Sequence, residues 1–149
     1  MARFRYSLQS ILNIKEKLET QKKQEFAAAQ IALSEQQEKT LALRNRLSDC
    51  EDRARVLLSG TLDFMEIQEN KALQLSLENR LKMQLVEEKK AEQNLERAKE
   101  EMVSARTERK TYETLREQAF REFMMEENKA ESRVVDELVS YTFGQKKKG

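Results

Sequence analysis

The feature that most constrains this chain is the near absence of residues that break a helix. Its 149 residues include no proline and three glycines, and only Gly60 lies within the first 143 residues. Strong helix formers such as Lys, Arg, Glu, Gln, Ala and Leu dominate the composition. With 37% charged and 6% aromatic residues, the chain has fewer large apolar side chains than a compact domain needs. The composition therefore predicts two long helices joined at Gly60.

The first half carries the period of a left-handed coiled coil, with apolar and small residues at steps of three and four. Two consecutive steps of four, from Leu18 through Lys22 to Phe26, indicate a stutter that locally unwinds the supercoil. Ser7 is expected to cap this helix with its hydroxyl oxygen. The expected seam runs through Ile11, Ile14, Leu18, Lys22, Phe26, Ala29, Leu33, Gln36, Thr40, Leu43, Leu47, Cys50, Ala54 and Leu57.

The pattern breaks around Gly60, which is expected to act as the hinge and to take the left-handed conformation that often ends a helix. Thr61 or Asp63 is expected to cap the second helix, with Glu66 completing a capping box with Asp63. The predicted organisation is a single elongated domain with a first helix over about residues 7–58, a hinge over 59–62, a second helix over 63–141 and a basic tail over 144–149.

The second helix has its own seam, in which small alanines alternate with Leu and Met between Ala91 and Ala105. A matching small patch occurs on the first helix at Ala27, Ala28, Ala29 and Ala32. A turn near Gly60 places residue i opposite roughly residue 122 minus i, so the patches meet in an antiparallel hairpin. The predicted fold class is therefore an all-α, antiparallel two-helix coiled-coil hairpin with unequal arms. The second seam runs through Ile67, Asn70, Gln74, Leu77, Leu81, Gln84, Glu88, Ala91, Leu95, Ala98, Met102, Ala105, Arg109, Tyr112, Leu115, Ala119 and Phe123.

Several seam positions are polar, namely Lys22, Gln36, Gln74 and Glu88. They have two interpretations: polar core residues can fix the register of a coiled coil, or long side chains can reach water from a loosely packed section. Cys50 also lies on the seam and is interpreted as a small buried residue rather than a reactive thiol.

The second helix outlasts the first, so residues beyond about Arg121 have no partner helix. This stretch is still rich in apolar side chains, which need a surface to bury against. Beside it, Phe4 and Tyr6 stand among Arg3 and Arg5, which predicts a protein-binding site at this end. The apolar residues are Phe123, Met124, Met125, Val134, Val135, Leu138, Tyr141 and Phe143.

The sequence offers little for catalysis. It has no histidine, and we find neither a glycine-rich phosphate loop nor a metal-ligand motif. The pairs Glu87-Glu88 and Glu126-Glu127 are interpreted as solvated helix faces. A net charge of +1 argues against nucleic-acid binding. We therefore expect a protein that is not an enzyme and has no cofactor and no metal.

No apolar run approaches the roughly 20 residues of a membrane span, and the first residues lack the apolar region of a signal peptide. A single cysteine permits no intramolecular disulfide. Together these features predict a cytoplasmic protein.

The two ends of the chain resemble the flagellar export protein FliJ family. The first match is Phe4-Arg5-Tyr6-Ser7-Leu8-Gln9-Ser10-Ile11-Leu12. The second is Arg109-Lys110-Tyr112-Glu113-Leu115-Arg116-Glu117, followed by Glu126-Glu127 and Val135-Asp136-Glu137-Leu138. The glycine break between unequal helices also agrees with the family.

This resemblance implies a stalk protein of the flagellar type III export apparatus, similar to the coiled coil of the rotary ATP synthase gamma subunit. Members bind the export ATPase hexamer and promote its assembly, contact the export-gate membrane protein FlhA, and escort export chaperones. The implied location is the cytoplasmic face of the inner membrane. The implied ATPase contacts are Arg3, Phe4, Arg5, Arg109, Glu113, Arg116, Phe123 and Leu138.

Two alternatives stay open from the sequence. A general coiled-coil scaffold or parallel homodimer would have no ATPase partner. The equivalent stalk of a virulence-type secretion system would share the chemistry and differ only in the terminal motifs.

Overall fold

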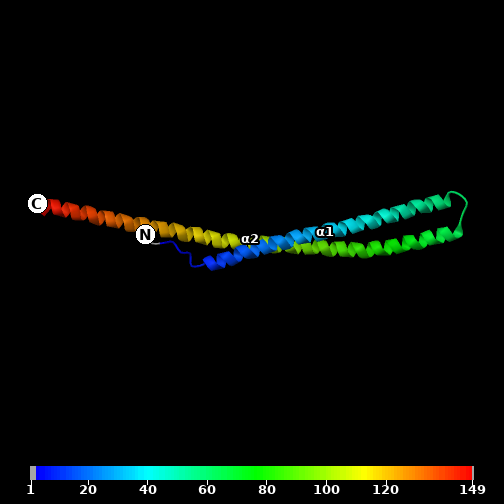
Figure 1. Cartoon of the computed structure of the whole chain (residues 1–149), viewed down its shortest axis with the longest axis horizontal. Helices are drawn as coiled ribbons and strands as arrows, with labels where there is room; N and C mark the ends of the chain where they lie inside the picture. The colour runs from blue at the N-terminus through cyan, green and yellow to red at the C-terminus, as the bar shows by residue number, and fades with distance from the viewer. Residues whose placement is uncertain (1–2, 149) are drawn as a thin grey trace. The chain divides into compact units, whose positions relative to one another are not determined.

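The computed structural model describes residues 3–148, and side chains for residues 3–145. This part of the chain forms two α-helices, α1 (Gln9–Leu58) and α2 (Phe64–Lys148), joined by a short loop (Figure 1). The chain divides into two units that each contain a segment of both helices. Unit 1 comprises Met1–Thr20 and Ser104–Gly149, and unit 2 comprises Gln21–Val103. The expected fold class, an all-α antiparallel helical hairpin, is confirmed.

Unit 2 is an antiparallel helical hairpin held by pairs that link its two helices. The ammonium of Lys22 lies 3.1 Å from the Glu101 carboxylate, and the Thr40 hydroxyl donates a hydrogen bond of 2.6 Å to Glu88. Nearer the loop, the Cys50 thiol donates to the Asn70 carbonyl at 3.5 Å. These pairs follow the expected register, in which residue i faces roughly residue 122 minus i.

The loop does not use the left-handed conformation expected of Gly60. No described residue, glycine included, has a positive φ. Instead, Ser59 closes α1, because its N–H (3.2 Å) and its hydroxyl (2.8 Å) both donate to the Val56 carbonyl. These two bonds satisfy a carbonyl of the last turn, which a left-handed glycine otherwise helps to satisfy. The expectation for the Gly60 conformation was therefore wrong.

Asp63 caps α2, as one of the two expected candidates. Its carboxylate accepts hydrogen bonds from the backbone N–H groups of Met65 at 3.1 Å and Glu66 at 3.4 Å. The Glu66 carboxylate lies 3.9 Å from the Arg53 guanidinium on α1, which draws it toward the neighbouring helix. The cap is therefore formed mainly by the Asp63 side chain.

The start of α1 differs from the prediction. The Leu8 carbonyl accepts the first helical hydrogen bond, from the Leu12 N–H at 2.9 Å. Ser7 lies in the preceding turn, where the Gln9 N–H donates to the Tyr6 carbonyl at 3.1 Å. The expected Ser7 cap was wrong, because Ser7 lies in a backbone turn and the helix begins only after Leu8.

The first turns of α1 also bury a different face from the one expected. In unit 1, Leu12 is 3% exposed whereas Ile14 is 62% exposed. The buried and half-buried residues here are spaced by four, three and four, at Leu8, Leu12, Lys15 and Glu19. The half-buried Lys22 comes three residues after Glu19, so steps of four and three alternate without two consecutive steps of four. The predicted stutter was therefore wrong: it arose from assigning Ile11 and Ile14 to the seam.

The core of unit 2 is thin and partly polar. Leu77 is 1% exposed, and Cys50 is buried at 5%, which agrees with its interpretation as a packed residue. Gln84 donates to the Gln36 side chain at 2.8 Å and to the Gln36 carbonyl at 3.1 Å. Among the described residues, no buried side-chain nitrogen or oxygen lacks a hydrogen bond. Cross-helix bonding of this kind favours the register-fixing interpretation of the polar seam over loose packing.

The small patches of the two helices meet in unit 2. Ala28, Ala29 and Ala32 of α1 line the same shallow groove as Ala91 of α2, and Ala91 is 8% exposed. Small residues on both sides let the two helix backbones approach closely, as the antiparallel register predicted.

The last helix is longer than expected. α2 continues to Lys148, beyond the predicted end near residue 141. Gly144 lies inside the helix, and a side chain built there would meet nothing within 4 Å. Because this region contains no proline, nothing ends the helix at residue 141.

Candidate protein-docking site

The N-terminal segment of unit 1 is anchored to α2 by an aromatic cluster. The ring of Phe4 meets Phe120 edge-on, with centroids 5.2 Å apart and planes at 79°, and its centroid lies 5.5 Å from that of Phe123. The Arg116 guanidinium lies 5.8 Å from the centre of the Phe4 ring. Edge-to-face contacts and an arginine over a ring are both favourable arrangements. The structure thus brings together three expected site residues, Phe4, Arg116 and Phe123.

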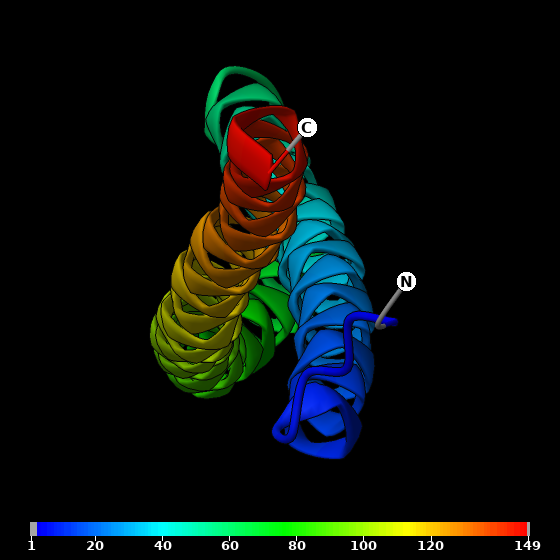
Figure 2. The ribbon, with the colours of Figure 1, turned by 90° about the vertical axis from the view of Figure 1, so that its left-hand side faces the viewer.

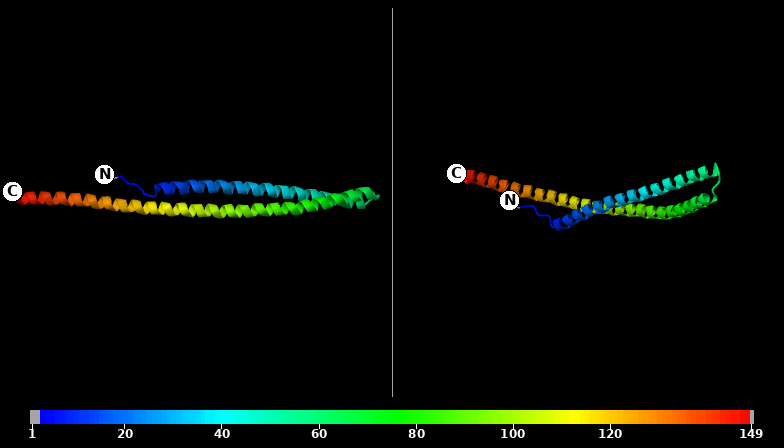
Figure 3. Two further views of the ribbon diagram at one scale, coloured as in Figure 1. Left: turned by 90° about the horizontal axis from the view of Figure 1, so that it is seen from below. Right: turned by 45° about the vertical axis from the view of Figure 1, so that its right-hand side comes forward.

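Polar bonds hold the same segment along α2. The Tyr6 hydroxyl donates to the Tyr112 carbonyl at 3.2 Å, and Arg116 donates through Nε to the Gln9 side chain at 3.0 Å. The extended segment leaves the start of α1 in Figure 2 and runs beside α2 in both views of Figure 3. Arg3 and Arg5 are both exposed on it. The anchored segment therefore presents two guanidinium groups next to the aromatic cluster.

A second cluster in unit 1 is built around a buried carboxylate. The side chain of Glu19 is 6% exposed. Its two carboxylate oxygens accept hydrogen bonds from two nitrogens of the Arg109 guanidinium, at 2.5 and 3.3 Å. Arg109 also lies 2.7 Å from Glu113, one turn along α2. The hydrogen bonds that Arg109 donates to Glu19, and then the one that it donates to Glu113, raise the pKa of Arg109 above its usual value. Arg109 and Glu113 are therefore engaged inside unit 1, apart from the aromatic cluster.

Sequence reasoning missed Glu19 as a member of this cluster. The sequence does contain a signal for it, because Glu19 lies three residues before the seam residue Lys22, which is a normal spacing along the seam. The charge of Glu19 made it an unexpected seam residue. Arg106 of α2 approaches the same carboxylate at 3.9 Å. A buried carboxylate needs such cationic partners, because leaving it unpaired away from water is costly.

Beyond Phe123, α2 continues without a facing helix in unit 1 (Figures 1 and 3). Its large apolar side chains are exposed to water, and Leu138 is 60% exposed. A shallow groove of about 260 Å³ is lined by Val135, Leu138, Val139, Thr142 and Phe143. Exposed apolar surface of this kind is typical of interaction sites.

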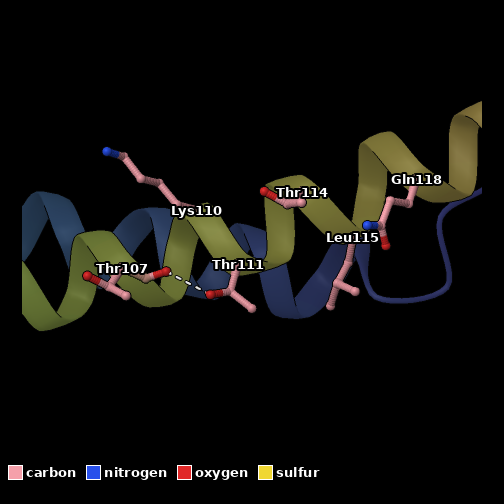
Figure 4. A pocket seen from close by; sticks show the side chains of 6 residues that line it. All are labelled: Thr107, Lys110, Thr111, Thr114, Leu115 and Gln118. Atoms are coloured by element: carbon pink, nitrogen blue, oxygen red, sulfur yellow. Dashed lines mark hydrogen bonds between the residues drawn. The ribbon is translucent and has the colours of Figure 1, made fainter.

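Another groove, of about 360 Å³, lies on a polar face of α2 in unit 1 (Figure 4). The Thr111 hydroxyl donates to the Thr107 carbonyl of its own helix at 3.0 Å, so it is occupied by the backbone. Leu115 lines this groove and is 40% exposed. Its expected place on the seam was therefore wrong, because the contact to α1 comes from the neighbouring Arg116.

The described residues hold no group of three or more His, Cys, Asp or Glu side chains arranged to bind a metal ion. Neither described helix contains a segment apolar enough to cross a membrane. The candidate docking site of unit 1 is made of aromatic, cationic and apolar side chains.

Comparison with known protein families gives a match over most of the chain. A protein-family model described as "Flagellar FliJ protein" matches residues 4–148, which includes both helices and the N-terminal segment. No curated protein and no solved structure shows a significant match to the chain. The family match covers nearly the whole length, and we conclude that the chain belongs to the flagellar FliJ protein family.

Proposed function

We propose that this chain is the stalk that binds the flagellar export ATPase and promotes assembly of its hexamer. Membership of the family makes the chain a component of the flagellar export apparatus, and the members of this family are not catalytic. The observation that carries the finer proposal is the uncovered apolar end of α2 in unit 1, where Leu138 and Val139 are 60% and 56% exposed.

The binding surface has two parts. The first is the anchored N-terminal segment, where Phe4 is fixed against Phe120 and Phe123 and where Arg3 and Arg5 are exposed. The second is the apolar end of α2 that follows Phe123. A ring of ATPase subunits buries such a surface only after the ring has assembled. Contacts made with the ring and absent in the single subunit shift the equilibrium toward the hexamer.

Arg109 and Glu113 have a different role in this proposal. Their mutual ion pair and the bond to Glu19 stabilise the helix pair that carries the surface. Arg3, Arg5 and Arg116 supply the cationic contacts to the ATPase.

The experiment is to mix the purified chain with the flagellar export ATPase and to measure hexamer formation by analytical ultracentrifugation together with ATP turnover. The chain is expected to raise both. A variant with Val135, Leu138 and Val139 changed to Gln removes the apolar surface and is expected to abolish the effect.

The matched control changes Leu75, Met83 and Val86 of unit 2 to Gln. These residues lie on the same helix and are 60%, 72% and 55% exposed, so the control introduces the same chemistry at a comparable exposure. It is expected to keep the full effect. If both triple variants behave alike, the proposed surface is wrong.

Further partners follow from the family alone. We propose that the chain also contacts the export-gate membrane protein FlhA and export chaperones, and that it works at the cytoplasmic face of the inner membrane. Co-purification of the intact chain with each partner, measured one at a time, tests these contacts. Absence of both complexes at micromolar concentration would contradict this extension.

A further inference from the structure

The packing of α2 within unit 1 ends shortly after Phe123. Glu127 is half-buried, and every other residue from 124 to 145 is exposed. The apolar side chains of this stretch are therefore open to a partner.

The exposed apolar residues are spread around this stretch of α2, and several of them share one side of the helix. Steps of three or four residues, or their multiples, connect Phe120, Met124, Val135, Leu138 and Thr142, so these residues share one side of an α-helix. Phe120 and Met124 are 46% and 42% exposed. We call this side, over residues 120–143, the outer stripe.

Two carboxylates interrupt the outer stripe in its middle. Glu127 stands three residues after Met124, and Glu131 stands four residues after Glu127 and four before Val135. Glu131 lines a shallow groove together with Ala130, Val134 and Val135. Both acidic side chains therefore belong to the same side of the helix as the apolar residues.

Neither carboxylate has a cation at the spacing that allows an ion pair along a helix. The positions three and four residues from Glu127 hold Phe, Met, Ala and Glu, and those around Glu131 hold Glu, Asn and two Val residues. Glu126 and Glu137, on the polar side, have Lys129 and Arg133 at such a spacing. Like charges four residues apart also destabilise a helix slightly.

We propose that Glu127 and Glu131 are the ionic contacts of the outer stripe, and that they pair with two basic side chains set in an apolar surface of the export ATPase. Burial of the stripe takes both carboxylates out of water, which is costly unless a cation meets each of them. The four-residue separation requires basic groups about 6 Å apart along the helix axis. This inference rests on the proposed function and adds the chemistry of the partner surface.

A second copy of this chain does not provide that chemistry. Two outer stripes packed together would bring four unpaired carboxylates into one interface, and like charges facing each other weaken association. The covering surface must instead be basic where the outer stripe is acidic.

The test measures the dissociation constant of the full chain and the assembled ATPase at several salt concentrations. The variant is the double substitution Glu127→Gln/Glu131→Gln. Because truncating one side of a desolvated charge pair costs at least about 2 kcal/mol in characterised interfaces, which is about thirtyfold in the dissociation constant, we expect binding weakened at least about thirtyfold. We also expect a shallower salt dependence.

The control is Glu126→Gln/Glu137→Gln, which removes the same charge from the polar side of the same helix. It is expected to bind within about twofold of the wild type. Leu138→Ala is expected to weaken binding and to leave the salt dependence unchanged, since it removes apolar contact only.

The outcomes are distinguishable. If the wild-type chain does not bind the ATPase, the proposed function fails and the inference fails with it. If the wild type binds but Glu127→Gln/Glu131→Gln binds equally well with the same salt dependence, the ionic contacts alone are overturned and the docking surface stands.

Discussion

Leu77 is the residue whose removal should cost the hairpin most. Its side chain is 1% exposed, and it is the one large side chain among the described residues that is fully buried. Leu77→Ala deletes three carbon groups, worth about 0.8 kcal/mol each in transfer free energy, and leaves a cavity. Because the neighbouring helix cannot collapse fully into the space, we expect the free energy of unfolding to fall by about 3 kcal/mol.

The control is Leu75→Ala, two residues away on the same helix, where the side chain is 60% exposed. It makes the same chemical change and gains the same helix propensity. Its expected cost is less than about 1 kcal/mol, because most of its surface is already in water. Urea unfolding followed by far-ultraviolet circular dichroism gives both values. Equal losses at Leu75 and Leu77 would refute the assigned packing face.

Three further predictions concern stability. Gly60→Ala should leave the free energy of unfolding unchanged or raise it by up to about 1 kcal/mol, because the φ of Gly60 is not positive and the space around it is open. A clear fall of the melting temperature in calorimetry would contradict the loop conformation. Glu19→Gln should speed hydrogen exchange in unit 1, because it weakens the buried ion pair; exchange equal to that of Glu16→Gln would argue against this. Hydrogen bonds that the Lys22 ammonium donates to Glu101, and then to Glu25, raise the pKa of Lys22 above 10.5. The stabilising contribution of Lys22 is therefore complete below pH 10.5 and is lost as the pH rises through the raised pKa. An equal alkaline loss of stability in Lys22→Met, measured by urea unfolding, would contradict this.

The helix content and the antiparallel pairing were predictable because their signals are redundant. A chain without proline leaves few places to turn, and the alanine patches around Ala29 and Ala91 agree with a turn near Gly60. Asp63 was also predictable as a cap, since a short acidic side chain before a helical run satisfies free N–H groups directly.

The first turns of α1 were not predictable from hydrophobicity. Ile11 and Ile14 are more apolar than Lys15 and Glu19, yet the latter two are the more buried. What decides the packing face is the partner: Glu19 meets Arg109, and Lys15 lies 2.8 Å from Glu108. A single sequence does not reveal such pairs until the register between the helices is known.

The docking surface was predictable only in outline. The apolar end of α2 is evident from its composition, and Phe4 was expected beside it. The contact of Phe4 with Phe120 depends on how α2 is rotated about its axis. Glu127 was interpreted as part of a solvated face because a carboxylate near other acidic residues usually is one.

The most direct test of the account is hydrogen exchange of the intact chain, alone and with the assembled export ATPase. In the free chain, amides of residues 124–143 should exchange faster than those of the paired helices in unit 2, because no other helix covers them. Addition of the ATPase should slow exchange in this stretch and leave unit 2 unchanged. If exchange slows in unit 2 while residues 124–143 stay as they were, the docking surface has been assigned to the wrong part of the molecule.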